Sequence, residues 1–295
     1  MEVAVGIPAY NEEKNIGAII AELYEITRNI IVCNDGSTDK TGIIAEKMGA
    51  IVINHEKNLG YGASIRSLFL KARETNTDVL VTIDADGQHR VEDIKVVLEP
   101  IFNNKADIVI GSRFLDKNQK NMPSYRKAGI KAITKLTNTA LEVNITDSQS
   151  GFRAYNKKVL SQIVPSDYGM GVSSEIIIKA SKAGFKIIEV PITVLYEGDT
   201  STHHPVSHGI SVILSTMKFI SIEHPMKFYG IPGFSFLAIG LFFIVWALQA
   251  FTETRQIITN ISLIGIGATI FGTVLVMSAI MLYSIVNLIR EQHKG

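Results

Sequence analysis

The C-terminal end of the chain contains two long stretches without a charged side chain. The first covers residues 228–252, which is 25 positions, and the second covers residues 256–289, which is 34 positions. An α-helix needs roughly 20 apolar residues to cross the hydrocarbon core of a bilayer. Two buried core helices are the alternative, but two such stretches in succession exceed the usual length of core helices. We therefore predict a hairpin of two transmembrane helices, at about 228–251 and 261–287, within a membrane domain 228–295.

Lysine and arginine side chains predict how this hairpin is oriented. Lys218, Lys227, Arg290 and Lys294 flank its outer ends, whereas Arg255 lies in the short connector. Loops rich in Lys and Arg stay on the cytosolic side of a membrane. We expect an integral, multi-pass membrane protein whose chain ends and remaining domain are cytosolic.

The segment 206–227, just before the hairpin, has the pattern of an amphipathic helix. Its apolar side chains recur at helical spacing at Ile210, Ile213, Leu214, Met217 and Ile220. The opposite stripe is formed by Ser211, Ser215 and Lys218. This pattern predicts a helix lying in the headgroup plane of the bilayer, with a core-packed helix of the soluble domain as the alternative.

The rest of the chain has the composition of a soluble domain. Residues 1–227 hold 26 of the 29 Lys and Arg and 26 of the 28 Asp and Glu. This balance argues against a nucleic-acid partner, because nucleic-acid binders need a basic excess. The single cysteine, Cys33, cannot form an intrachain disulfide, which fits a reducing cytosolic setting.

Strand-like and helix-like segments alternate along residues 1–205. The predicted strands are Val3–Ile7, Asn29–Cys33, Ala50–Ile53, Val79–Ile83 and Asp107–Ile110. The predicted helices are Glu13–Ile26, Thr41–Met48, Ala63–Thr75 and Val91–Phe102. Such alternation predicts an α/β domain whose mostly parallel sheet carries helices on both faces. Ligands of such sheets bind at the carboxyl ends of the strands.

Polar clusters follow three of these strands. They are Pro8-Ala9-Tyr10-Asn11-Glu12, Asn34-Asp35-Gly36-Ser37-Thr38-Asp39 and Asp84-Ala85-Asp86-Gly87-Gln88. Asp84 and Asp86 can both face one divalent cation, and Gln88 can add a neutral oxygen ligand. Mg²⁺ and Mn²⁺ prefer such oxygen ligands and often share them with substrate phosphates. The alternative for the pair is a solvated turn, and for Asp35 and Glu12 a helix cap and a first-turn acid.

Together with Gly111-Ser112-Arg113 and Ser150-Gly151-Phe152-Arg153, these clusters resemble known motifs. In this order they resemble the family 2 glycosyltransferases with the GT-A (Rossmann-like) fold, in particular the branch similar to dolichol-phosphate mannose synthases. The resemblance covers roughly residues 1–205, which we take as the catalytic domain.

The resemblance implies a role for each matching position. Nucleotide-sugar binding would involve Pro8, Ala9, Tyr10, Glu12, Cys33, Asp35, Asp84, Ala85, Asp86 and Gln88. The metal, Mg²⁺ or Mn²⁺, would be held by Asp84, Asp86 and Gln88. Arginines near the acceptor phosphate or the donor diphosphate would be Arg113, Arg126 and Arg153. The catalytic set would be Asp84, Asp86, Arg113 and Asp147, with Asp147 orienting either the acceptor site or an arginine.

One loop departs from the family pattern. Many members carry an Arg- and Lys-rich loop before the membrane segment, but residues 196–209 contain neither and include His203, His204 and His208. In this the chain is similar to archaeal dolichyl-phosphate hexosyltransferases, some of which use UDP-sugars. The loop favours UDP-linked glucose or N-acetylglucosamine and leaves GDP-mannose open. A mobile lid is the interpretation we favour for residues 199–208, with a passive interfacial loop and a transition-metal site as alternatives.

The resemblance implies an inverting glycosyltransferase that moves a hexose or N-acetylhexosamine to dolichyl or polyprenyl phosphate for protein glycosylation. A different membrane acceptor, such as a glycolipid or glycan, is one alternative. The Gln-x-x-Arg-Trp motif of processive synthases is absent, since the single tryptophan, Trp246, lies in a predicted span. A catalytically silent nucleotide-sugar sensor is another alternative, although the Asp84, Asp86 and Gln88 positions are intact. Homo-oligomerisation is left open.

Overall fold

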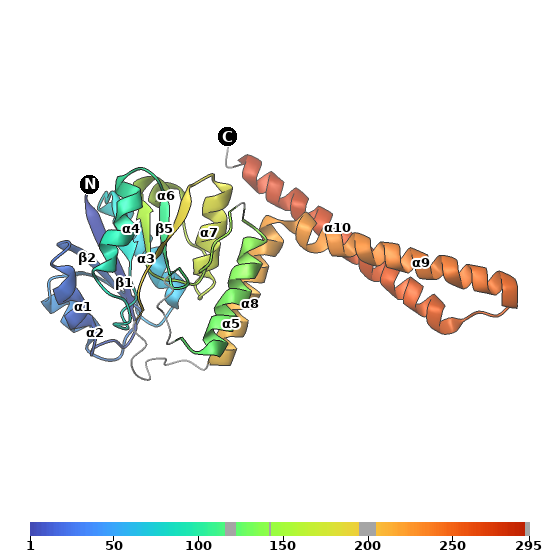
Figure 1. The fold of residues 1–295 in the computed structure, drawn as a ribbon, viewed down its shortest axis with the longest axis horizontal. Coiled ribbons are helices and arrows are strands. Elements are labelled where there is room, and N and C mark those ends of the chain that lie inside the picture. Colours follow the sequence, from blue (N-terminus) through green and yellow to red (C-terminus); the bar gives the residue numbers. More distant parts are fainter. Residues whose placement is uncertain (116–121, 142, 195–204, 293–295) are drawn as a thin grey trace. The chain divides into compact units, whose positions relative to one another are not determined.

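A seven-stranded sheet forms the centre of the N-terminal part of the chain in the computed structural model (Figure 1). The structure describes residues 1–115, 122–141, 143–194 and 205–292. The chain divides into two units, Met1–Thr216 and Met217–Gly295. The strands are β1 (Val3–Ala9), β2 (Asn29–Asn34), β3 (Ile51–Asn54), β4 (Val79–Thr82), β5 (Ile108–Ser112), β6 (Arg153–Asn156) and β7 (Ile187–Pro191).

The strand order of the sheet is β3-β2-β1-β4-β6-β5-β7. All neighbouring strands run parallel except β6, which is antiparallel to both β4 and β5. β1 lies between β2 and β4, and its last residue, Ala9, is in register with Asn34 at the end of β2. The polar clusters that follow β1, β2 and β4 therefore meet at one edge of the sheet.

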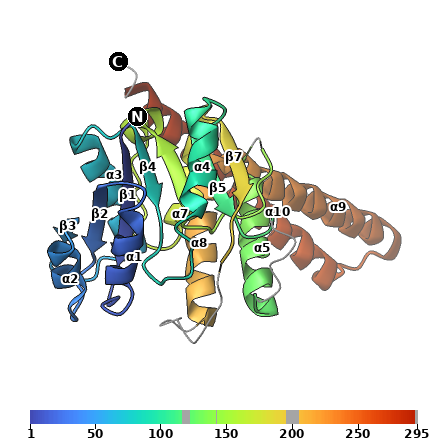
Figure 2. The ribbon, with the colours of Figure 1, turned by 60° about the vertical axis from the view of Figure 1, so that its left-hand side comes forward.

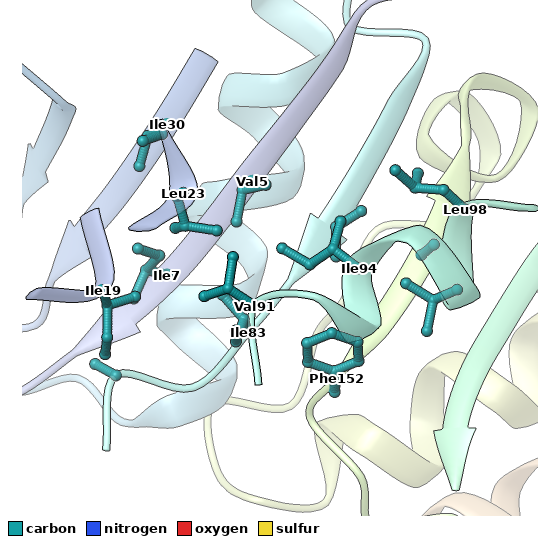
Figure 3. Packing of buried hydrophobic residues seen from close by; sticks show 14 of the residues in the cluster. Val5, Ile7, Ile19, Leu23, Ile30, Ile83, Val91, Ile94, Leu98 and Phe152 are labelled. Carbon is teal, nitrogen blue, oxygen red and sulfur yellow. The ribbon is translucent and has the colours of Figure 1, made fainter. Parts of the chain in front are cut away.

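Helices cover both faces of this sheet (Figure 2). The helices of the N-terminal unit are α1 (Ile16–Leu23), α2 (Thr41–Lys47), α3 (Tyr61–Glu74), α4 (Asp93–Phe102), α5 (Ser124–Asn138), α6 (Lys157–Gln162) and α7 (Val172–Lys182). On one face α1 and α4 pack their apolar sides against the sheet, where Leu23, Ile94 and Phe152 lie in one buried cluster (Figure 3). On the other face α3, α6 and α7 form a second cluster.

The predicted α/β fold with a mostly parallel sheet is confirmed. All five predicted strands and all four predicted helices occur, with ends shifted by a few residues. β6, β7, α5, α6 and α7 were not predicted. β6 is short and carries polar Arg153 and Asn156 at its ends, so its sequence lacks the apolar run that marks a buried strand.

Helix α8 (Pro205–Glu223) contains the boundary between the two units, which lies between the predicted boundaries at 205 and 227. Its Ser215 hydroxyl donates a hydrogen bond to Asp167, and Thr216 is fully buried. Three residues of the predicted apolar stripe are exposed, namely Ile213, Leu214 and Met217. Ile220 is buried, so the exposed apolar face is narrower than predicted.

The C-terminal unit is a helical hairpin. After the end of α8, it contains the π-helical turn η1 (Met226–Gly230), α9 (Ile231–Thr254) and α10 (Thr259–Gln292). Two spans, Met226–Thr254 and Thr259–Leu288, have a mean hydropathy of 2.2 and the length needed to cross a membrane. Large apolar side chains such as Leu241 and Phe242 are more than half exposed. These are the two long helices that the sequence predicted.

Glycines set the distance between α9 and α10. A methyl group on Gly233 would lie 3.1 Å from the carbonyl oxygen of Gly272, and one on Gly240 would lie 2.7 Å from the backbone nitrogen of Thr269. Gly265 and Gly272, both on α10, approach the backbone of α9 just as closely. Small residues let the backbones of membrane helices approach each other, which is the main source of packing energy where apolar burial gives no advantage.

Candidate active site

The loop after β4 presents two carboxylates at the edge of the sheet. Gly87 adopts a left-handed conformation with φ of +70°. The backbone N–H of Gln88 then donates to Asp86 Oδ1 over 3.0 Å. Glycine adopts this conformation without the steric cost of a Cβ atom. The turn therefore fixes the Asp86 carboxylate, and Asp84 is close enough for its charge to act on it.

Asp84 is held by two aromatic side chains. Tyr61, at the start of α3, donates its hydroxyl to Asp84 Oδ1 over 3.1 Å. His89 Nε2 lies 3.6 Å from Asp84 Oδ2, and its ring stacks on Phe152 with 5.2 Å between centroids. Burial raises the pKa of Asp84, but the hydrogen bond and charge of His89, the Tyr61 hydroxyl and Arg113 outweigh burial and lower the pKa below its ordinary value.

Asp86 has the opposite electrostatic environment. Burial and the negative charge of Asp84 raise the pKa of Asp86 above its ordinary value. The Gln88 backbone N–H, His89 and Arg126 oppose this rise without cancelling it. Two carboxylates this close repel each other, and a bound cation would remove the repulsion. Arg126, on α5, is thus near enough to Asp86 to act on its charge.

The donor set of this loop fits a hard divalent cation. A methyl group on Gly151 would lie 2.7 Å from both carboxylate oxygens of Asp84, so the glycine keeps the space beside that carboxylate open. Within the described part of the chain, no group of three or more His, Cys, Asp or Glu side chains could hold a metal ion. The ligands that the protein can provide to a cation here are the carboxylates of Asp84 and Asp86 and the side chain of Gln88. Magnesium sites with so few protein ligands are completed by water and substrate phosphates.

The loop after β2 holds a third carboxylate in a different way. Asp35 accepts the backbone N–H groups of Leu59 over 3.0 Å and Gly60 over 2.9 Å. Its Oδ1 atom also lies 2.7 Å from Nδ1 of His55, the residue that follows β3. Gly36, at φ of +68°, makes the turn, and a methyl group there would lie 2.3 Å from the Lys57 backbone. Asp35 is therefore fixed by three donors.

His55 connects Asp35 to the interior of the sheet. Its Nε2 atom lies 2.9 Å from the Ser67 hydroxyl and 3.6 Å from Cys33 Sγ. Burial raises the pKa of the Cys33 thiol to about 11, so Cys33 is an uncharged thiol at neutral pH. The Cys33 side chain lies in the second apolar cluster, beneath the predicted nucleoside pocket.

The loop after β1 completes this side of the edge. The Ala9 carbonyl accepts the Asp35 backbone N–H over 2.9 Å, and Tyr10 is 40% exposed. The Glu12 backbone N–H donates to Thr41 Oγ1 over 2.8 Å. Burial raises the pKa of the Glu12 carboxyl, and nearby Asp86 raises it further, against the hydrogen bond from Asn15. Pro8 and Ala9 end β1 beside Cys33 and Asn34.

Arg113 is paired with Asp147 on the other side of the edge. Arg113 Nε and Nη2 donate to the two Asp147 carboxylate oxygens over 2.6 and 2.8 Å. The Asp147 backbone N–H in turn donates to Glu189 Oε1 over 2.9 Å. Asp147 is fully buried; burial raises its pKa, but the charge and hydrogen bonds of Arg113 lower it below its ordinary value. Of the two roles left open for Asp147, orienting an arginine is the one that this geometry supports.

Arg153 occupies a different position from the one expected. Its guanidinium group donates to the backbone carbonyls of Ser150, Ser173 and Ser148, each over 2.8 Å. The residue is 1% exposed. These carbonyls hold the group inside the domain, so Arg153 fixes the chain around Gly151, and its role at an acceptor phosphate stays a prediction.

The sheet edge thus brings together most of the predicted site residues. The loops after β1, β2 and β4 converge, and Arg126 acts on Asp86. Sequence reasoning missed His55, Tyr61 and His89. His55 and His89 lie in loops that follow β3 and β4, and this position after a strand was the signal by which they could have been found. Residues 199–204 of the predicted lid, including His203 and His204, lie outside the described residues, and residues 205–208 begin α8.

Comparison with known proteins identifies the family to which this chain belongs. The family model described as Glycosyl transferase family 2 matches residues 4–164. The chain belongs to this family. The matched residues include the polar clusters after β1, β2 and β4 and both carboxylates of the central loop.

Named relatives and solved structures agree with this assignment. The UDP-N-acetylglucosamine–dolichyl-phosphate N-acetylglucosaminyltransferase of Methanococcus voltae is 37% identical over 236 residues, covering 72% of this chain and 91% of that protein. The dolichyl-phosphate hexose transferase of Haloferax volcanii is 33% identical, covering 77% of this chain and 96% of that protein. Glucosyl-3-phosphoglycerate synthase of Mycobacterium tuberculosis has the same fold, with a TM-score of 0.57 at 20% identity, covering 74% of this chain and 78% of that one.

Proposed function

We propose that this glycosyltransferase moves a hexose or N-acetylhexosamine from a nucleotide-sugar to dolichyl or polyprenyl phosphate. The observation that carries the proposal is the carboxylate edge of the sheet in a chain with two helices of membrane-spanning length. The named relatives from M. voltae and H. volcanii act on dolichyl phosphate and support the same acceptor. UDP-linked glucose, UDP-linked N-acetylglucosamine and GDP-mannose are the donors in question.

The central loop would hold the diphosphate of the donor. Asp84, Asp86 and Gln88 are the residues that would bind Mg²⁺ or Mn²⁺, with Ala85 beside them. The cation supplies positive charge where the leaving diphosphate develops negative charge. Tyr61 and His89 keep Asp84 in place, so the carboxylate needs little rearrangement when the donor binds. On one side of this loop, the donor-binding set proposed for the nucleoside is Pro8, Ala9, Tyr10, Glu12, Cys33 and Asp35.

Arg113 and Arg126 would receive the acceptor phosphate. A planar guanidinium group binds phosphate through paired hydrogen bonds, and Asp147 fixes the plane of the Arg113 group. A lipid monophosphate is already an anion at neutral pH and can attack the anomeric carbon without a strong base. The work of the protein is then positioning and charge stabilisation. Attack from the face opposite the diphosphate inverts the anomeric centre.

The hairpin would place the catalytic unit where a lipid acceptor can reach it. The exposed apolar residues Ile213, Leu214 and Met217 of α8 suit contact with a bilayer surface. Lys218, Lys227 and Arg290 at the outer ends of the hairpin favour cytosolic chain ends. A cytosolic catalytic unit would have direct access to nucleotide-sugars.

The test uses purified full-length protein in detergent micelles with Mn²⁺, polyprenyl phosphate and each radiolabelled nucleotide-sugar in turn. We expect a labelled product that partitions into chloroform and has the mass of a lipid-phosphate sugar. Transfer only to a glycolipid or glycan would replace the proposed acceptor. Nucleotide-sugar binding without any product would favour a sensor instead.

A further inference from the structure

The nucleoside side of the edge has one unusual property, which is that its carboxylate is already engaged by the protein. Asp35 Oδ1 faces both the Leu59 N–H and His55 Nδ1, and Asp35 Oδ2 accepts the Gly60 N–H. A carboxylate has about four acceptor positions in all. One position on Oδ2 therefore remains for a ligand, and the side chain is only 5% exposed.

His55 is the side chain that makes this arrangement rigid. Because the Asp35 carboxylate can only accept, Nδ1 of His55 donates and Nε2 becomes an acceptor. Nε2 lies 2.9 Å from the Ser67 hydroxyl, which can donate to it. The imidazole, itself 10% exposed, is therefore held at both nitrogens and occupies one acceptor position of Oδ1.

Nucleobases differ in how many donors they present on one edge. Uracil and thymine present a single N–H, at N3, between two carbonyl oxygens. Guanine presents two adjacent donors, N1–H and the 2-amino group, which pair with both oxygens of one carboxylate. Cytosine has an acceptor at N3. A carboxylate with one remaining acceptor position satisfies the N3–H of uracil but leaves one guanine donor unpaired, and an unpaired buried donor is costly.

We propose that His55 is a positioning residue that limits Asp35 to one acceptor position and thereby selects uracil-type donors over guanine. The inference rests on the proposed function, since it assumes that the nucleoside binds at this side of the edge. It narrows the donors in question to the UDP-linked sugars.

The first test needs no variant and measures the dissociation constants of nucleoside diphosphates by calorimetry with Mn²⁺ present. We expect UDP and dTDP to bind at least about tenfold more tightly than GDP and CDP, since one hydrogen bond in a desolvated site has roughly this value. We also expect 3-methyl-UDP, which lacks the N3–H, to bind about tenfold more weakly than UDP. GDP binding as tight as UDP binding, or equal binding of UDP and 3-methyl-UDP, would overturn the inference and leave the proposed function intact.

The second test asks whether His55 sets this selectivity. His55→Ala should reduce the UDP preference over GDP to less than about threefold, because Asp35 regains an acceptor position for the second guanine donor, and should keep the preference over 3-methyl-UDP, because the N3–H of uracil still finds an acceptor. His55→Asn keeps a donor near the place of Nδ1 and should retain most of the preference. Asn54→Ala, at the exposed neighbouring position, is the matched control and should leave the preference unchanged.

These outcomes separate the two proposals. If no nucleoside diphosphate binds, both the proposed function and the inference are wrong. If UDP is preferred but His55→Ala keeps the full preference over GDP while remaining folded, the role of His55 is wrong. If His55→Ala does not fold, the role of His55 is tested by the His55→Asn variant together with the binding of UDP, GDP and 3-methyl-UDP to the wild-type protein. Loss of the UDP preference in His55→Asn then contradicts the inference.

Discussion

The edge of the sheet has a centre and two flanks that treat their carboxylates differently. On the flanks, Asp35 is engaged by backbone N–H groups and His55, and Asp147 is paired with Arg113. In the centre, Asp84 and Asp86 lie close together, and burial and the charge of Asp84 raise the pKa of Asp86. The flanks are therefore electrostatically complete without a ligand, whereas the centre gains from a cation.

This difference teaches how the work of the site divides. Groups that recognise a ligand by shape benefit from being fixed in advance, because little is then lost in ordering them. Groups that bind a metal with a charged diphosphate can remain unfavourable until both arrive. The comparison predicts that changes in the centre affect catalysis and metal dependence, while changes on the flanks affect selectivity or stability.

The largest effect is expected in the centre. Asp86→Asn removes one of the two proposed metal-binding carboxylates and should reduce sugar transfer at least about 100-fold, because metal charge stabilisation contributes several kcal/mol. Initial rates with polyprenyl phosphate and Mn²⁺ measure this. Asp78→Asn, at the opposite end of β4, is the control and should keep wild-type rates. Full activity of Asp86→Asn would remove the metal assignment.

Removing the metal should affect ligand binding at the centre but not at the nucleoside flank. We expect EDTA to weaken UDP binding at least about tenfold, because the diphosphate loses its counter-charge, and to leave uridine binding unchanged. Calorimetry with both ligands, with and without chelator, measures the contrast. If EDTA weakened uridine binding as much as UDP binding, the nucleoside flank would depend on the metal to bind its ligand.

On the other flank we expect a loss of stability. Asp147→Asn leaves the Arg113 charge without its buried partner and should lower the free energy of unfolding by about 3 kcal/mol. Asp147 has a lowered pKa in the folded protein, so its carboxylate stabilises the fold above the unfolded pKa of about 3.9 and loses this effect as pH falls through the lower folded pKa.

The difference between wild type and Asp147→Asn should therefore shrink below about pH 4. Thermal unfolding in detergent across a pH series measures it. Glu74→Gln, in the exposed pair with Lys71, is the matched carboxylate-to-amide control and should unfold like wild type. A difference that grows in acid would contradict the pairing.

The smallest effect is expected at Cys33, beneath the nucleoside flank. Its thiol has a pKa of about 11 and is fully buried, so little thiolate is present at pH 8. We expect iodoacetamide to modify it at least about tenfold more slowly than free cysteine, as followed by mass spectrometry. Rapid modification of the folded protein would show that this flank opens to solvent.

Much of the fold could be predicted from local patterns. Apolar runs such as Val79–Thr82 and periodic helices such as Tyr61–Glu74 determine their own secondary structure. β6 could not be predicted, because its four residues become a strand only between β4 and β5, which supply its hydrogen bonds. The predicted spans agree with α9 and α10, but the spacing of those helices depends on glycines that pair only in the folded hairpin.

The candidate site could be predicted where a carboxylate follows a strand, as for Asp35, Asp84 and Asp86. Partners far away in the sequence could not, because a single sequence does not show which loops meet. His55 is 20 residues from Asp35, and Asp147 is 34 residues from Arg113. The buried position of Arg153 could not be predicted, because a guanidinium group suits phosphate and backbone carbonyls equally well.

The sequence by itself determined the family, the carboxylates of the sheet edge and the two apolar helices, because each is written in contiguous residues. The tertiary structure decided which of these carboxylates are engaged. Asp35 contacts His55 and two backbone donors, and Asp147 pairs with Arg113. Tyr61 and His89 hold Asp84, but its charge still acts on the nearby Asp86. The physical reason is that hydrogen bonds and charges act over a few ångströms in space, whatever the separation along the chain.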